Sequence, residues 1–118
     1  MAENYITKIE EKGTINISED VIVNIVRSAA IEVDGVAGFA NTAGAEIAEF
    51  IGFKTMSKGV KIQLNGDKNV IDTLINVKYG SNIVSVAEKV QSRILEAVEA
   101  GTGIENVEVN VHVTGIAF

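Results

Sequence analysis

The sequence contains no cysteine and no proline, and it has a single histidine. Without cysteine the chain cannot form disulfides, thiolate zinc sites or a cysteine nucleophile. One histidine cannot build a histidine-rich metal site, and we therefore predict that the protein holds no metal and no cofactor. Because proline is absent, we expect glycine, asparagine and aspartate to make the turns, since these residues tolerate positive φ angles.

Long apolar runs and basic charge are also scarce. No run approaches the ~20 residues that a membrane-spanning helix needs, and residues 1–4 lack the basic start of a secretory signal. We therefore expect a cytoplasmic protein, or one held at the membrane by a partner. The net charge of −6 disfavours a dedicated nucleic-acid-binding protein, because phosphates require a basic face.

The clearest pattern lies in residues 79–118. Apolar residues recur first at helical spacing and then at alternate positions, which predicts an amphipathic helix followed by a strand with one buried face. The helical stripe comprises Ile83, Val86, Ala87, Val90, Ile94, Ala97 and Val98. The predicted strand has Val107, Val109, Val111 and Val113 on one face and Glu108, Asn110, His112 and Thr114 on the other.

The earlier residues predict one more long helix and several strands. Ser18 is expected to cap a helix that ends at Gly35, a residue suited to the left-handed conformation. The sequence also predicts strands at 14–17 and 36–40, a short helix at 41–51, and a hairpin formed by residues 59–64 and 70–79. This order predicts an α+β fold with two layers, in which two main helices and a short third helix cover one face of a mixed sheet. We expect residues 1–12 to be an N-terminal segment, either an extra strand or frayed, before a single domain at 13–118.

His112 is the first residue to consider as a general base or metal ligand. The predicted strand supplies only Glu108 and Asn110 beside it, on the same polar face. We therefore interpret His112 as a solvated strand residue. No pair of carboxylates suggests a general acid matched with a base, so the sequence indicates no catalytic residue and no enzyme.

Two surfaces remain as candidates for contact with a partner. One is a lysine patch, Lys54, Lys58 and Lys61, interleaved with apolar residues in a stretch without acidic residues. Such a mixture binds anionic partners, membranes or nucleic acids, although the apolar residues can instead enter the core. The other is the polar strand face formed by Glu108, Asn110 and His112.

Two further features allow alternative interpretations. Gly35–Gly38 has the glycine spacing of the loop with which KH domains clamp nucleic acid. Together with the lysine patch it leaves a small nucleic-acid-binding module as an alternative function, whereas the structural alternative is a helix end with a close backbone approach. The apolar C-terminal residues 115–118 either finish the core or join a subunit interface.

Several blocks of sequence resemble the alkaline-shock, or general-stress, protein family of Gram-positive bacteria. The blocks are Gly13–Ser18, Glu32–Gly38, Ser57–Lys61, Tyr79–Ile83 and Val107–Gly115. The resemblance runs over nearly the whole chain. Because the chain has no long charged extension, it looks like a short housekeeping member of that family.

The resemblance implies a non-enzymatic cytoplasmic protein linked to cell-envelope stress or homeostasis. Such a protein would act as an interaction or scaffold protein through a protein partner, such as a membrane-embedded anchor that holds it at the membrane. The resemblance also implies self-association into a homo-oligomer. The alternative role that the resemblance implies for the protein is control of fatty-acid synthesis through acetyl-CoA carboxylase, a lipid-synthesis enzyme. The family supplies no catalytic residue and no cofactor.

Overall fold

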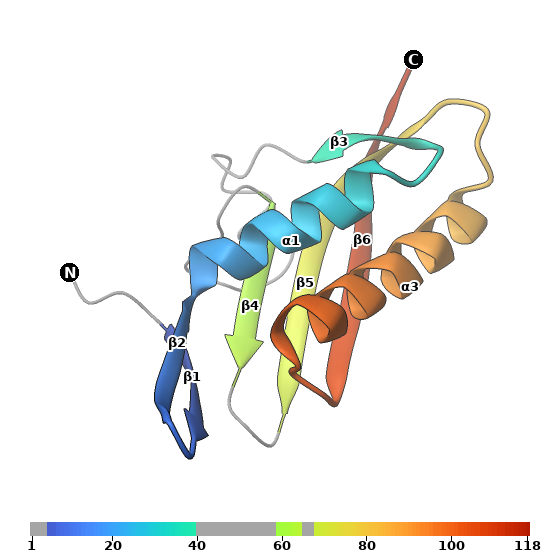
Figure 1. Cartoon of the computed structure of the whole chain (residues 1–118). Coiled ribbons are helices and arrows are strands. Elements are labelled where there is room, and N and C mark those ends of the chain that lie inside the picture. The colour runs from blue at the N-terminus through green and yellow to red at the C-terminus, as the bar shows by residue number, and fades with distance from the viewer. Residues whose placement is uncertain (1–4, 40–58, 65–67) are drawn as a thin grey trace.

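The structure is a computed structural model, and it describes residues 5–39, 59–64 and 68–118 (Figure 1). In chain order the elements of these residues are β1 (Tyr5–Glu10), β2 (Gly13–Ser18), α1 (Glu19–Ile31), β3 (Val36–Phe39), β4 (Val60–Leu64), β5 (Asn69–Lys78), α3 (Ile83–Thr102) and β6 (Val107–Ala117). The short helix predicted at residues 41–51 lies outside the described residues.

The main sheet is organised around β5. β6 pairs with β5 in parallel along its whole length, as expected when a helix connects two strands of one sheet. On the other side of β5, β4 pairs antiparallel with residues 69–73, and β3 pairs antiparallel with residues 75–77. Both helices lie on one face of this sheet (Figure 1). The predicted α+β fold with a mixed sheet and two main helices on one face is therefore confirmed.

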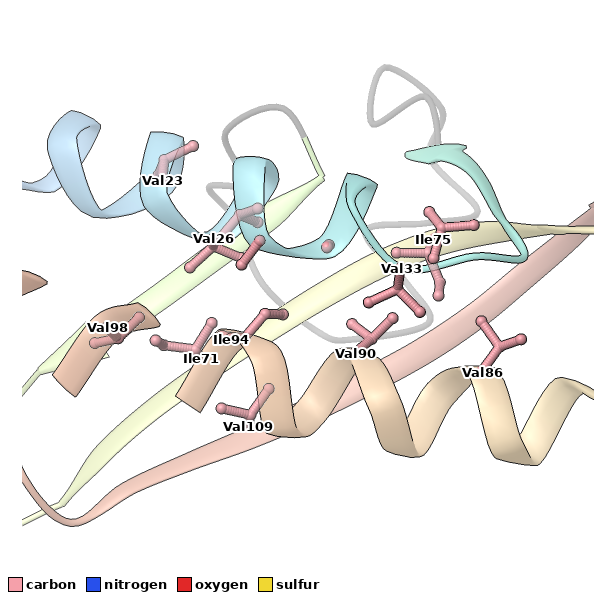
Figure 2. Packing of buried hydrophobic residues seen from close by; sticks show 14 of the residues in the cluster. Val23, Val26, Val33, Ile71, Ile75, Val86, Val90, Ile94, Val98 and Val109 are labelled. Atoms are coloured by element: carbon pink, nitrogen blue, oxygen red, sulfur yellow. The ribbon is translucent and has the colours of Figure 1, made fainter. Parts of the chain in front are cut away.

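The core lies between the sheet and the two helices (Figure 2). The helices contribute small and branched apolar side chains at the spacing that the sequence predicted, and β5 contributes every second residue. The completely buried members are Ile22, Val26, Ala30, Ile71, Ile75, Val77, Val90, Ile94 and Val98. Ile83 was also expected in the apolar stripe of α3, but it is 39% exposed because it occupies the first position of the helix.

Residues next to α3 in the sequence determine where the helix begins and ends. The side-chain Oδ1 of Asn82 accepts the N–H of Ser85 at 3.0 Å, which satisfies one of the free donors at the start of the helix. At the other end Gly103 has φ 75°, the left-handed conformation that commonly ends helices. Ser18 occupies the capping position of α1 as predicted, although its side chain makes no capping hydrogen bond.

The prediction that Gly35 ends α1 is wrong. The helix ends at Ile31, and Glu32 follows it in a right-handed conformation. Gly35 lies further on, with φ 101°, in the turn that leads into β3. A Cβ atom at this position would come within 2.6 Å of Cγ2 of Val86 on α3. Glycine is therefore required here by backbone conformation and by the close approach of α3.

β1 and β2 form a separate two-stranded antiparallel sheet. Tyr5 lies opposite Ser18 and Glu10 lies opposite Gly13, so the two strands are in register from end to end. The hairpin projects from the start of α1, beyond the end of the main sheet (Figure 1).

Candidate interaction surface

The structure brings candidates from two separate sequence regions to the same sheet face. Lys61 on β4 lies opposite Asp72 on β5, and Asp72 lies opposite Asn110 on β6. Residues in register on neighbouring strands share a face, so these three side chains form one row on the face opposite the helices. Glu108 and His112 flank the row on β6 and lie on the same face. We call these five residues the polar face. Lys54 and Lys58 lie outside the described residues.

His112 contacts a carboxylate that the sequence analysis did not select. Its Nε2 atom lies 3.0 Å from Oδ1 of Asp72. The side chains are only 25% and 10% exposed, respectively, so the contact is partly protected from water. The interpretation of His112 as a solvated strand residue is therefore wrong. A hydrogen bond to a largely buried carboxylate fixes the orientation of the imidazole ring within the polar face.

The other polar side chains of β6 are also held in place. Nδ2 of Asn110 donates to Oε2 of Glu108 at 3.2 Å. The hydroxyl of Thr114 lies 3.4 Å from the carbonyl oxygen of Ile75 on β5. Such contacts reduce the rotamer freedom of these side chains before any partner binds, which lowers the entropic cost of binding.

Asp72 could be recognised from the sequence only in part. It is the one acidic residue of β5, and aspartate is disfavoured within strands, so it is a local signal of a special environment. Its partner lies 40 residues later in the chain. The contact becomes visible only when β5 and β6 are known to pair in parallel and in this register.

The opposite surface of the molecule has two hollows between the helices. One has a volume of about 620 Å³ and the other about 490 Å³. Arg93 on α3 and Glu32, just after α1, form an ion pair that borders both hollows. Because both side chains are more than half exposed, the pair contributes little to stability. None of the candidate contact residues that the structure describes, Lys61, Glu108, Asn110 and His112, lines these hollows.

The glycine pair Gly35 and Gly38 has a structural explanation. Gly35 packs against α3, Val36 is buried, and Gly38 belongs to β3, where the register with β5 shifts. In contrast, the C-terminal residues do not finish the core. Phe118 is 97% exposed, and its ring lies 4.9 Å from the ring of Tyr79, centroid to centroid.

The polar face offers hydrogen-bond donors, acceptors and both signs of charge. Such a set recognises a partner by polar contacts, whereas proton transfer would also require a substrate positioned within reach of His112. Among the described residues no group of three His, Cys, Asp or Glu side chains could hold a metal ion. None of the helices in the described ranges is long and apolar enough to cross a membrane.

Comparisons with known proteins identify relatives over nearly the whole chain. The model of the alkaline shock protein family, which is described as having a "cell envelope-related function", matches residues 7–118. The "Uncharacterized protein YqhY" of Bacillus subtilis (strain 168) is 34% identical over 122 residues, which cover 100% of this chain and 90% of that protein. A "Stress response regulator gls24 homolog" of Streptococcus pyogenes serotype M3 is 24% identical over 123 residues, which cover 98% of this chain and 69% of that protein.

Similarity to solved structures is weaker. A variant of "MamM CTD" aligns with 82% of this chain and 94% of that chain, with 16% sequence identity and a TM-score of 0.49. At this level the likeness supports no statement about function.

Proposed function

Because the chain belongs to the alkaline shock protein family, whose function is cell envelope-related, we propose that it is a non-enzymatic interaction protein of the envelope stress response. Its task is to bind a protein partner that holds it at the cytoplasmic side of the membrane. The relative named as a stress response regulator supports the link to stress. The surface of this chain that contacts the partner is the polar face, which consists of Lys61, Asp72, Glu108, Asn110 and His112.

The observation that carries this proposal is the contact between His112 and Asp72. The nearly buried carboxylate of Asp72 holds the imidazole ring next to the row that Asp72 forms with Lys61 and Asn110. Interfaces gain specificity when charged and polar groups are fixed in a complementary pattern before binding. The polar face has this character, whereas the hollows between the helices are bordered by an exposed ion pair that water screens.

A charge reversal at the edge of the polar face tests the proposal. We would express the tagged full-length chain in a Gram-positive host that carries the family, crosslink the cells, and quantify the recovered proteins by mass spectrometry. Glu108→Lys should reduce recovery of an envelope protein about tenfold, because a reversed interface charge costs on the order of 1.4 kcal/mol. Glu108 is exposed, so the variant should fold normally.

Glu99→Lys is the matched control. Glu99 is an exposed residue of α3, outside the polar face, and its substitution makes the same change in net charge. It should leave recovery unchanged. The proposed function is wrong if both variants recover the same proteins in the same amounts, or if the wild-type chain recovers no envelope protein. Recovery of acetyl-CoA carboxylase in place of an envelope protein would instead favour a role in fatty-acid synthesis.

A further inference from the structure

The outer edge of β6 is a row of backbone groups that no described strand pairs with. The direction of these groups follows from the ladder on β5. Leu74 donates its N–H to the carbonyl of Gly59, on the β4 side, at 2.9 Å. Because the peptide groups of successive residues point to opposite sides of a strand, the odd-numbered residues of β5 point toward β6.

The register then determines which residues of β6 face outward. Ile71 lies opposite Val109, and in a parallel ladder it bonds to the two neighbours of that residue, Glu108 and Asn110. In the part of β6 before the register shift next to Ile75, the residues that direct their N–H and C=O groups away from β5 are therefore Val107, Val109, Val111 and Val113. Unpaired edge groups of this kind are a template for another strand.

One of these outward groups already has an amide donor. The side-chain Nε2 of Gln91, on α3, donates to the carbonyl oxygen of Val109 at 3.1 Å. This is the position that a backbone N–H of an added strand would occupy. The side-chain amide of Gln91 has the same chemistry as a peptide N–H, so it stands in for one residue of such a strand.

Apolar side chains of α3 flank Gln91. Ala87 and Leu95 lie four residues before and after it and are half-buried, and Val84 lies two turns before it and is 67% exposed. Residues four apart on a helix share a face, so these side chains line the same side of α3 as Gln91. The open edge therefore has an apolar stripe on its helix side and the polar face on its other side.

We propose that the outer edge of β6 binds an extended peptide segment of a protein partner as an additional strand. Main-chain hydrogen bonds to the outward valines supply the affinity, and alternate side chains supply the specificity. The segment should carry apolar residues toward Ala87 and Leu95 and polar residues toward the side of Glu108 and His112. This inference rests on the proposed function in taking the ligand to be a protein, and it adds the mode of binding.

An extended peptide fits this edge better than a second copy of the chain. If two copies paired through β6 about a two-fold axis, α3 of both copies would lie on the same face of the joined sheet, next to the axis. Each helix already reaches the edge of its own strand through Gln91. A single extended segment has no helix to place there.

The test attaches a strand to the complete protein. We would extend the chain after Phe118 by a flexible Gly/Ser linker and the seven-residue segment Val-Thr-Val-Thr-Val-Thr-Val, which is long enough to lie opposite residues 107–113, and measure amide hydrogen exchange by NMR. The linker supplies a millimolar effective concentration, so weak pairing becomes detectable. The amides of Val107, Val111 and Val113 should exchange at least tenfold more slowly than in the unextended chain. The amides that already bond to β5 should not change.

Substitutions at Val111 separate edge pairing from folding. Val111→Pro removes an outward N–H and leaves the ladder with β5 intact, so it should abolish the added protection. Val111→Thr keeps the N–H and should retain the added protection against exchange. Both variants should keep the circular dichroism spectrum of the wild-type chain. Unchanged exchange at all outward amides in the extended chain would overturn the proposal. Protection that depends on protein concentration in the unextended chain would identify a second copy as the occupant and would also overturn it.

Gln91 provides an independent measurement. A free peptide, acetyl-Lys-Thr-Val-Thr-Val-Thr-Lys-amide, should bind Gln91→Ala about fivefold more tightly than the wild-type chain, because one competing hydrogen bond is lost. Gln63→Ala, at an exposed position on β4, is the matched control and should not change affinity. Weaker binding by Gln91→Ala would show that Gln91 contacts the peptide and does not compete with it for the carbonyl oxygen of Val109.

These measurements distinguish failure of the binding mode from failure of the proposed function. The exchange experiment uses no cellular partner, so it can fail while the envelope protein is still recovered with the tagged chain. Conversely, an appended strand can protect the edge even if no envelope protein is recovered.

Discussion

The two faces of the main sheet are built from different kinds of contact. The face toward α1 and α3 is packed with valine and isoleucine from every element that reaches it (Figure 2). The opposite face carries Lys61, Asp72 and Asn110 in register on three neighbouring strands, and His112 in contact with Asp72, beside the fully buried Leu74. The first face gains its free energy from buried apolar area, which is not directional, and the second from a few oriented contacts. The comparison indicates that stability resides mainly on the first face, whereas the second is the face for which we propose recognition of a partner.

The largest effect is expected in the helix-side core. Ile94 is completely buried, and Ile94→Ala should lower the free energy of unfolding by about 4 kcal/mol, through lost burial and an unfilled cavity. Val84→Ala, on the exposed side of the same helix, should change it by less than about 0.5 kcal/mol. Urea denaturation followed by circular dichroism measures both. Equal effects of the two substitutions would contradict the assignment of stability to the core face.

Alanine substitutions at Gly35 and Gly80 test how closely the turn before β3 approaches α3. Gly35→Ala should cost about 3 kcal/mol, because the new Cβ would meet Val86 at 2.6 Å and because φ is 101°. Gly80 has a similar φ of 92°, but nothing lies within 4 Å of its Cβ position. Gly80→Ala should therefore cost only about 1 kcal/mol, from backbone strain alone. Thermal unfolding should separate the two variants. If they are equally destabilised, contact with α3 is not what requires glycine at position 35.

A double-mutant cycle measures the contact on the polar face. Asp72→Ala and His112→Ala should each cost about 1–2 kcal/mol, because each leaves the other partly buried group without this partner. The double variant should cost less than the sum, with a coupling of about 1 kcal/mol. Additive effects in urea denaturation would show that the two side chains do not stabilise each other. The coupling should remain well below the cost of Ile94→Ala, in keeping with the contrast between the two faces.

Most of the fold could be predicted from local patterns. The apolar stripe of α3 and the alternation of β6 each arise within one element, and each element must bury its own apolar side. The same reasoning predicted β4 and β5 as a hairpin, since they follow one another in the chain. It failed at Gly35, because a glycine that is required by contact with a distant helix looks the same in sequence as one that ends a helix.

The polar face could be predicted only in part for the same physical reason. Alternation placed Glu108, Asn110 and His112 on one face of a strand, and Lys61 on one face of another. Nothing in either segment indicates that Asp72 lies between them. That arrangement depends on β5 being central and on its parallel register with β6, which are properties of the whole sheet.

The smallest effect is expected at Thr73, a polar residue within the helix-side core. Thr73 lies on β5 opposite Val60 and Val111 and is completely buried, and its hydroxyl has no hydrogen-bond partner among the described residues. An unsatisfied buried hydroxyl destabilises the folded state, so its replacement by a methyl group of similar shape removes that cost. Thr73→Val should raise the free energy of unfolding by about 1 kcal/mol in urea denaturation. Thr14→Val, at an exposed position of β2, is the matched control and should have almost no effect. Destabilisation by Thr73→Val would show that the hydroxyl is satisfied in solution, and the helix-side core would then contain a polar contact of the kind that characterises the opposite face.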